Sequence, residues 1–127
     1  MSYDYVVDSS VWVEYFNGTE KGNKVKAIIE EENIAASIMT IAELADKFSR
    51  ENKPFDDFLQ FILSRSAIIQ LDIELILNAA KIKKEQRSKK PKFGIVDAIH
   101  LATAQKEKST FLTLDKDFSG INSVIIL

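Results

Sequence analysis

The 127-residue sequence predicts an α/β fold, a three-layer sandwich in which helices cover both faces of a mainly parallel five-stranded sheet. Three observations carry this prediction. Short β-branched segments alternate with longer segments of helical periodicity, which is typical of parallel sheets with crossover helices. The segment from Lys92 to Gln105 is apolar on nearly every side of a helix, which indicates a buried helix. The chain is long enough for one hydrophobic core and too short for two, so we expect residues 1–127 to form a single domain.

The composition excludes several kinds of site. The chain has no cysteine and one histidine, which rules out disulfides, thiolate metal sites and a multi-histidine metal site within one chain. A metal would have to be bound by oxygen atoms, which favours hard cations such as Mg²⁺ or Mn²⁺. No apolar run reaches the length of a membrane span, and the first residues lack the basic charge of a signal peptide. We therefore expect a cytoplasmic protein that does not enter a membrane.

The predicted strands are short segments rich in β-branched and aromatic residues, each bounded by polar or turn-forming residues. In chain order they are Asp4–Val7, Ile34–Ile38, Ala67–Leu71, Thr110–Leu114 and Ser123–Leu127. Helical segments separate the first four of them. This alternation is what favours parallel rather than antiparallel pairing.

Two helices are expected between the first and second strands. The first runs from Ser9 through an apolar stretch to the stop signal at Asn17-Gly18. The second, residues 24–32, is amphipathic, with Val25, Ile28 and Ile29 facing inward.

Two more helices are expected between the second and third strands. Thr40 can cap the first of them, residues 41–50, and Glu43 stands three residues later, as in a capping box. Pro54 suits the first turn of the second, residues 54–64. These helices contain more phenylalanine than one small core requires, which is consistent with a surface that binds a partner.

A pair of helices is expected before the fourth strand. The first runs from Ile73 to about Lys90, and Pro91 closes it. Its predicted apolar face consists of Ile73, Ile76, Leu77 and Ala80. The buried helix follows Gly94 and carries a single acid, Asp97, in its first turn. A buried carboxylate requires a partner, and this helix offers no lysine or arginine up to Gln105.

Four acids collect at one edge of the predicted sheet. Asp8 and Asp115 follow strands directly, Glu43 lies in the first turn of a helix after a strand, and Asp97 begins a helix that leads into one. All four therefore belong to the carboxyl ends of the strands, where open α/β sheets bind ligands. Each acid alone could be structural: an N-cap, a capping-box member, a helix-dipole partner or a turn residue. Together they repel, and a divalent cation relieves that repulsion.

Four sequence motifs in the expected order suggest a family. They are VVDSSVWVEYF at 6–16, TIAELADK at 40–47, GIVDAIHLATA at 94–104 and TLDKDF at 113–118. With these motifs the chain resembles the PIN-domain nucleases, and among them the small VapC-type toxins of prokaryotic toxin–antitoxin pairs and their archaeal relatives. The resemblance spans nearly the whole chain and implies a sheet order of 3-2-1-4-5.

The resemblance implies a metal-dependent endoribonuclease. Asp8, Glu43, Asp97 and Asp115 match the family's metal-binding acids, and Asp117 matches a frequent auxiliary acid. Ser9 and Thr113 resemble the hydroxyl residues that often flank the site. The implied chemistry is hydrolysis of a phosphodiester bond, most often in RNA, with one or two Mg²⁺ or Mn²⁺ ions.

Other features acquire a meaning from this resemblance. His100 is either a general base or a packed histidine with one hydrogen bond, and the second is favoured because metal-activated water needs no histidine. Residues 81–92 hold seven basic residues and one acid. Within that stretch Lys83, Arg87 and Lys90 are expected on one helix face near the acids, where they would guide the RNA backbone. An antitoxin and a homodimer are common partners in the family.

Three alternatives stay open at this point. An inactive PIN-like domain would bind RNA or a protein without cutting. A receiver-like domain has the same architecture but normally has paired acids after the first strand, whereas here Asp8 is followed by Ser9 and Ser10. A DNA-directed nuclease is also compatible, because metal-binding acids do not distinguish the sugars.

Overall fold

The computed structural model describes residues 3–127, and its sheet confirms the predicted order and the predicted fold class. Five strands pair in the order β3-β2-β1-β4-β5, and every pairing is parallel. The strands are β1 (Tyr5–Val7), β2 (Ile34–Ser37), β3 (Ser66–Ile69), β4 (Thr110–Thr113) and β5 (Val124–Ile126).

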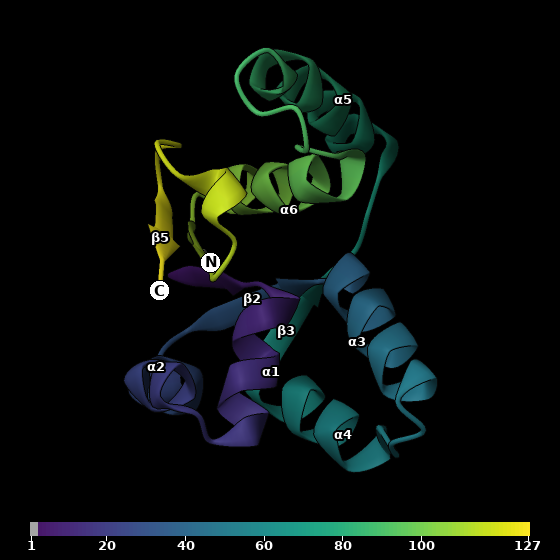
Figure 1. The fold of residues 1–127 in the computed structure, drawn as a ribbon, viewed down its shortest axis with the longest axis vertical. Coiled ribbons are helices and arrows are strands. Elements are labelled where there is room, and N and C mark those ends of the chain that lie inside the picture. Colours follow the sequence, from purple (N-terminus) through teal and green to yellow (C-terminus); the bar gives the residue numbers. More distant parts are fainter. Residues whose placement is uncertain (1–2) are drawn as a thin grey trace.

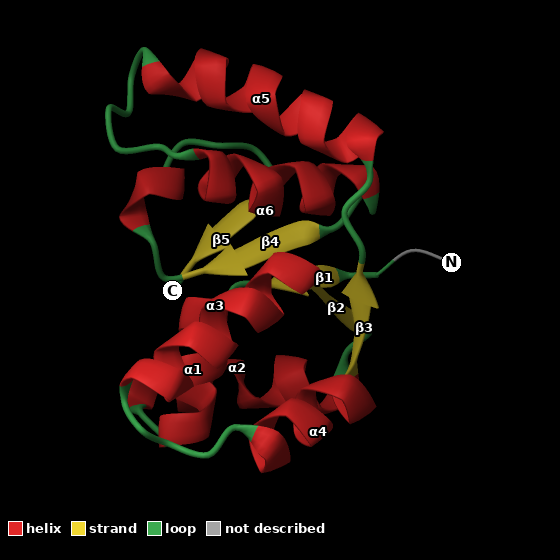
Figure 2. Ribbon diagram, turned by 90° about the vertical axis from the view of Figure 1, so that its right-hand side faces the viewer, coloured by secondary structure: helices red, strands yellow, loops and turns green. Residues whose placement is uncertain are grey.

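The helices cover both faces of the sheet (Figures 1 and 2). α5 and α6 lie on one face, with α5 outermost, and the other four lie on the opposite face. Their bounds are α1 (Ser9–Asn17), α2 (Glu20–Glu31), α3 (Ile38–Arg50), α4 (Asp56–Arg65), α5 (Ile73–Arg87) and α6 (Ile95–Lys106), and a 3₁₀ turn, η1, spans Lys116–Phe118. Among the described residues, none of these helices has the length and hydropathy that a membrane span requires.

Each face of the sheet has its own apolar core, because successive strand residues point to opposite faces. On β1, Val6 packs among residues of α5 and α6, whereas Val7 packs among residues of α1 to α4. Both valines are fully buried. This two-sided burial explains why the strands read as continuous apolar segments rather than as an alternating pattern.

The start of α3 differs from the sequence prediction. Ser37, not Thr40, is the N-cap, and its hydroxyl accepts a hydrogen bond from the Met39 N–H at 3.0 Å. The helix therefore begins at Ile38 and Thr40 is buried inside its first turn. Glu43 consequently lies one turn further into the helix than predicted. The prediction that Thr40 caps α3 was wrong, because Ser37, at the end of β2, caps the helix earlier in the chain.

The buried face of α5 also differs from the prediction. Leu75, Ala79 and Ile82 are buried, whereas Ile73 is 78 % and Leu77 is 61 % exposed. Both sets have helical spacing, so periodicity alone does not choose between them. The choice follows from how α5 docks on α6: the buried set packs in one core with α6 and Phe93. The residues predicted as the apolar face of α5 form an exposed stripe instead.

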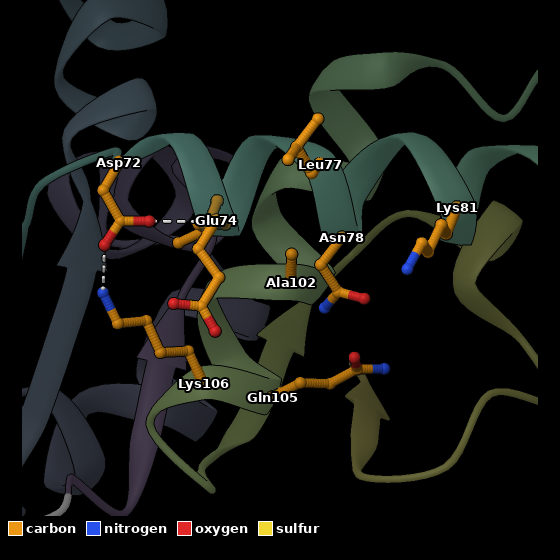
Figure 3. A pocket seen from close by; sticks show the side chains of 9 residues that line it. Asp72, Glu74, Leu77, Asn78, Lys81, Ala102, Gln105 and Lys106 are labelled. Atoms are coloured by element: carbon orange, nitrogen blue, oxygen red, sulfur yellow. Dashed lines mark hydrogen bonds and ion pairs between the residues drawn. The ribbon is translucent and has the colours of Figure 1, made fainter.

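A groove of about 500 Å³ runs between α5 and the C-terminal half of α6, and Figure 3 shows the side chains that line it. Asn78 extends from α5 toward α6. Asp72 and Lys106 form an ion pair of 2.9 Å across its end. The two helices therefore run in opposite directions, and the N-terminus of α6 lies at the far end from this groove.

The phenylalanine side chains of α3 and α4 pack against one another and against the aromatic rings of α1. Phe48 contacts Phe55 and Phe58 with ring centroids 4.9 and 5.1 Å apart, and Phe58 contacts Phe16 at 4.6 Å. A hollow of about 490 Å³ remains between α1, α2 and α4, lined in part by Tyr15, Phe16, Phe58 and Phe61. Much of the aromatic surplus noted in the sequence is therefore used inside the fold.

Candidate metal centre

Asp8 follows β1 directly and caps the N-terminus of α1. It is 7 % exposed. Its Oδ1 accepts a hydrogen bond from the Ser9 N–H at 2.7 Å. Its Oδ2 accepts hydrogen bonds from the hydroxyls of Thr113 at 2.7 Å and Ser10 at 3.1 Å. These donors compensate the burial of the carboxylate and fix its orientation.

Glu43 from α3 and His100 from α6 meet beside Asp8. His100 Nε2 lies 2.8 Å from Oε1 of Glu43 and 3.8 Å from Oδ1 of Asp8. The His100 side chain is 3 % exposed and that of Glu43 is 38 % exposed, so the glutamate reaches the site from the surface. Asp8, Glu43 and His100 each offer one ligand atom, and these atoms lie within 4.8 Å of one another. The Asp8 and Glu43 carboxylates can bind a cation here, and the His100 Nε2 is already engaged by Glu43.

Asp97, Asp115 and Asp117 complete the acidic edge. Asp97 Oδ2 accepts a hydrogen bond from the Gly94 N–H at 2.8 Å, so Asp97 closes the first turn of α6. Asp115 Oδ1 accepts one from the Asp117 N–H at 2.8 Å. Burial raises the pKa of Asp97, the Gly94 hydrogen bond opposes this, and the charges of Asp115 and Asp117 raise it further. The three carboxylates are therefore close enough to repel.

Apart from His100, the acids of this edge have no basic partner among the described residues. Within residues 3–127, no lysine or arginine forms an ion pair with the five carboxylates. They are Asp8, Glu43, Asp97, Asp115 and Asp117. Uncompensated like charges at one edge are costly in the absence of a cation.

Of the two predicted hydroxyl residues, Thr113 has the clearer contacts. Its hydroxyl donates to Asp8 and accepts from the Asp115 N–H at 3.0 Å, which links the ends of β1 and β4. Ser9 contributes chiefly its backbone N–H, since its hydroxyl lies 3.4 Å from Asp8. Ser10 was not predicted: its hydroxyl donates to Asp8 and accepts from the Leu114 N–H at 3.2 Å. Its position two residues after a strand-ending aspartate was the available signal.

His100 is tightly enclosed. Its ring stacks on Phe111 at 5.7 Å between centroids, and its buried Nδ1 has no hydrogen-bond partner among the described residues. Burial lowers the pKa of His100, but the Glu43 hydrogen bond and the charges of Asp8, Glu43 and Asp97 raise it by more. Because Nε2 is already engaged by Glu43, the geometry matches the expectation of a packed histidine with one hydrogen bond.

The predicted basic residues do not share one helix face. α5 ends at Arg87, three residues before Lys90. The Arg87 Nε–H donates to the Pro91 carbonyl at 2.7 Å, which turns its guanidinium back onto the following loop. Lys90 lies in that loop beside Ser119. Lys83 remains on the helix.

The sequence matches the model of the PIN domain family over residues 5–123. The chain belongs to the PIN domain family. This match covers β1 to β4 and ends one residue before β5 begins. Among curated proteins, none matches the chain.

Solved structures agree on the fold. A toxin–antitoxin complex from Klebsiella pneumoniae contains a chain with a TM-score of 0.77 and 24% identity, covering 96% of both chains. VapBC2 from Rickettsia felis, bound to a DNA fragment of its promoter, gives 0.75 and 23%, covering 97% of this chain and 96% of the other. VapC20 from Mycobacterium tuberculosis, a toxin that cleaves the sarcin–ricin loop, gives 0.71 and 16%, covering 94% and 95%. At these identities the likeness establishes the shared fold.

Proposed function

We propose that this PIN-domain protein is a metal-dependent endoribonuclease and the toxin of a toxin–antitoxin pair. The observation that carries the proposal is the convergence of Asp8 and Glu43, with Asp97 and Asp115 at the same edge and, within residues 3–127, no lysine or arginine paired with them. The fold that the chain shares with VapC-type toxins supports the toxin assignment.

The donor set fits a hard divalent cation. The acids offer only oxygen atoms, which suits Mg²⁺ or Mn²⁺, and their mutual repulsion favours binding of one or two such ions. Asp8, Glu43, Asp97 and Asp115 would hold the metal, with Asp117 in support. When bound, such an ion lowers the pKa of water and neutralises charge on the phosphate.

The protein's own groups supply orientation rather than a nucleophile. Thr113 and Ser10 fix the Asp8 carboxylate, and the Gly94 N–H fixes Asp97. Because these donors are part of the rigid sheet edge and helix ends, the carboxylates are pre-organised before substrate arrives. No side chain is required to attack the phosphodiester bond.

The basic segment would position the RNA. Lys83, Arg87 and Lys90 lie at the end of α5 or just beyond it, and α5 runs antiparallel to α6, so this segment is on the Asp97 side of the molecule. We expect these residues to contact the phosphate backbone without reading sequence. Replacing all three by alanine should weaken RNA binding and flatten its salt dependence, measured by fluorescence anisotropy. Unchanged RNA binding at low salt would contradict a role for these three residues in RNA binding.

An antitoxin would use the aromatic hollow between α1, α2 and α4. Partly buried rings of Tyr15, Phe16, Phe58 and Phe61 line it, and such rings are frequent anchors of protein interfaces. RNA, toxin and antitoxin would meet in the cytoplasm.

A homodimer would use the exposed stripe of α5 rather than the phenylalanine-bearing helices. Ile73 and Leu77 are its most exposed apolar side chains, and Glu74 and Lys81 lie on either side of Leu77 along the helix. An antiparallel second copy would place Glu74 opposite Lys81 of the partner subunit. Glu74→Lys should therefore weaken the dimer and the added Lys81→Glu should restore it, as measured by light scattering. A dimer that both single reversals leave intact contradicts this face.

A second candidate is a PIN-like module that binds RNA or a partner without cutting. It would keep the acids and bind metal but show no metal-dependent cleavage. The full set of acids at the edge favours the nuclease.

The deciding experiment is cleavage of a mixed set of structured RNAs with Mg²⁺, Mn²⁺ or EDTA. Wild type and Asp97→Asn are compared. Cutting that needs metal and falls roughly 100-fold or more in the variant supports the nuclease, since metal sites contribute several kcal/mol and about 1.4 kcal/mol is tenfold. Cutting that persists in the variant indicates a contaminating ribonuclease. Mn²⁺ binding without cutting of any RNA favours the binding module.

A further inference from the structure

The carboxylates of the proposed metal centre are held in two different ways. Three aspartates each accept a hydrogen bond from a backbone N–H one to three residues away. These are Asp8, Asp97 and Asp115. Glu43 has no local donor: within residues 3–127, its one hydrogen bond comes from His100, 57 positions away in the sequence. The orientation of Glu43 thus depends on a tertiary contact.

Glu43 is also the acid with the most freedom to move. Its side chain has more rotatable bonds than an aspartate and is 38 % exposed. A carboxylate that must first be ordered binds a cation less tightly than one already in place. Whatever fixes Glu43 therefore contributes to metal affinity without touching the metal.

His100 is well placed to fix it. The ring is 3 % exposed, stacks on Phe111 at an interplanar angle of 19°, and belongs to a helix in which residues 98–104 are all buried. A carboxylate only accepts hydrogen bonds, so Nε2 must carry the proton that is shared with Oε1 of Glu43. Nε2 carries that proton in both the Nε2–H neutral form and the charged form of the ring. The contact therefore persists whichever form is present.

We propose that His100 is a positioning residue that holds the Glu43 carboxylate beside Asp8 in readiness for the divalent cation. The role rests on the proposed metal centre. His100 acts through Glu43: its Nε2 is taken by that carboxylate, and its Nδ1 is enclosed by the core. It is neither a metal ligand nor the base of the reaction. Removing the N–H donor should weaken metal binding without unfolding the protein.

The test is Mn²⁺ binding by isothermal titration calorimetry on the full chain, with no RNA present. His100→Phe keeps a ring on Phe111 but has no donor, and His100→Gln retains an amide N–H of similar reach. We expect His100→Phe to weaken Mn²⁺ binding by about 10-fold or more, the usual effect of losing a group that orients a metal ligand. His100→Gln should recover part of that loss. His100→Asn, which is too short to reach Glu43, should resemble His100→Phe and replaces it if that variant does not fold.

A double-mutant comparison separates positioning from direct ligation. In a Glu43→Ala background, His100→Phe should cause no further loss of Mn²⁺ affinity. An equal loss in both backgrounds would overturn the inference, because His100 would then act independently of Glu43. Wild-type affinity in His100→Phe would overturn it as well.

The control variant Asp8→Asn distinguishes a wrong role for His100 from a wrong metal centre. If wild type binds Mn²⁺, Asp8→Asn does not, and His100→Phe matches wild type, the metal centre stands and the role of His100 is wrong. If wild type binds no Mn²⁺, or Asp8→Asn binds it as wild type does, the metal centre is wrong and the inference fails with it. Melting temperatures of the metal-free variants establish that each is folded.

Discussion

α5 and α6 are neighbours on the same face of the sheet, yet their sequences specify burial very differently (Figure 2). α6 is apolar on nearly all sides, and its residues 98–104 are buried without exception. α5 has two apolar stripes of helical spacing, and the stripe with more large side chains is the exposed one. A helix that is apolar all round can only be buried on every side. In a helix with two apolar stripes, the packing against neighbouring elements decides which stripe is buried.

The largest difference between the two helices is expected when one leucine on each is truncated to alanine. Leu101 on α6 is 2 % exposed and Leu77 on α5 is 61 % exposed. Leu101→Ala should lower the free energy of unfolding by about 2–5 kcal/mol, because it leaves a cavity in the core. Leu77→Ala should change it by less than about 0.5 kcal/mol in the monomer. Urea denaturation measures both, and equal losses would mean that α5 buries the stripe the sequence favoured.

Enlarging a small residue on each helix gives a somewhat smaller contrast. Ala102 on α6 is 1 % exposed, whereas Ala80 on α5 is exposed. Ala102→Leu should cost roughly 1–3 kcal/mol by overpacking, and Ala80→Leu should be nearly neutral. Thermal melts of the two variants check this. A tolerated leucine at position 102 would show that α6 packs more loosely than its burial indicates.

The first turn of α6 can be tested through its acid. Asp97 has a raised pKa, mainly because of burial, so its ionised form destabilises the metal-free protein. Stability should therefore fall as pH rises from the ordinary aspartate pKa through the raised value. Asp97→Asn, which can still accept the Gly94 hydrogen bond, should raise the metal-free melting temperature at neutral pH. The gain should vanish in acid, where Asp97 is protonated in both states, and a loss at neutral pH would mean that Asp97 serves as a structural cap.

The smallest effect is expected where α5 and α6 are joined at the surface. The Asp72–Lys106 ion pair spans 2.9 Å between exposed side chains. Its hydrogen bond lowers the pKa of Asp72, but water and salt screen such pairs. Lys106→Ala should leave the melting temperature almost unchanged at physiological ionic strength. A clear drop would show that this pair, and not the buried stripe, orients α5.

Much of the candidate site could be predicted from the sequence, because the sheet topology fixes where the acids lie. Asp8 and Asp115 follow strands β1 and β4, and parallel neighbours bring their carboxyl ends together. The contact between Glu43 and His100 could not be predicted from the sequence. It joins two helices on opposite faces of the sheet across its edge, and no local pattern encodes such a pairing. The cap of α3 was misassigned because two hydroxyl residues, Ser37 and Thr40, compete locally for that role.

The sequence by itself determined the elements of this protein, their parallel pairing and the edge on which the acids collect, whereas the strand order was implied by the family resemblance. These follow from local propensity, strand–helix alternation and chain connectivity, which act at short range. Only the tertiary structure decided which stripe of α5 is buried, and that His100 rather than a nearby backbone N–H holds Glu43. Both are outcomes of packing between elements far apart in the sequence, where several arrangements satisfy the same local pattern.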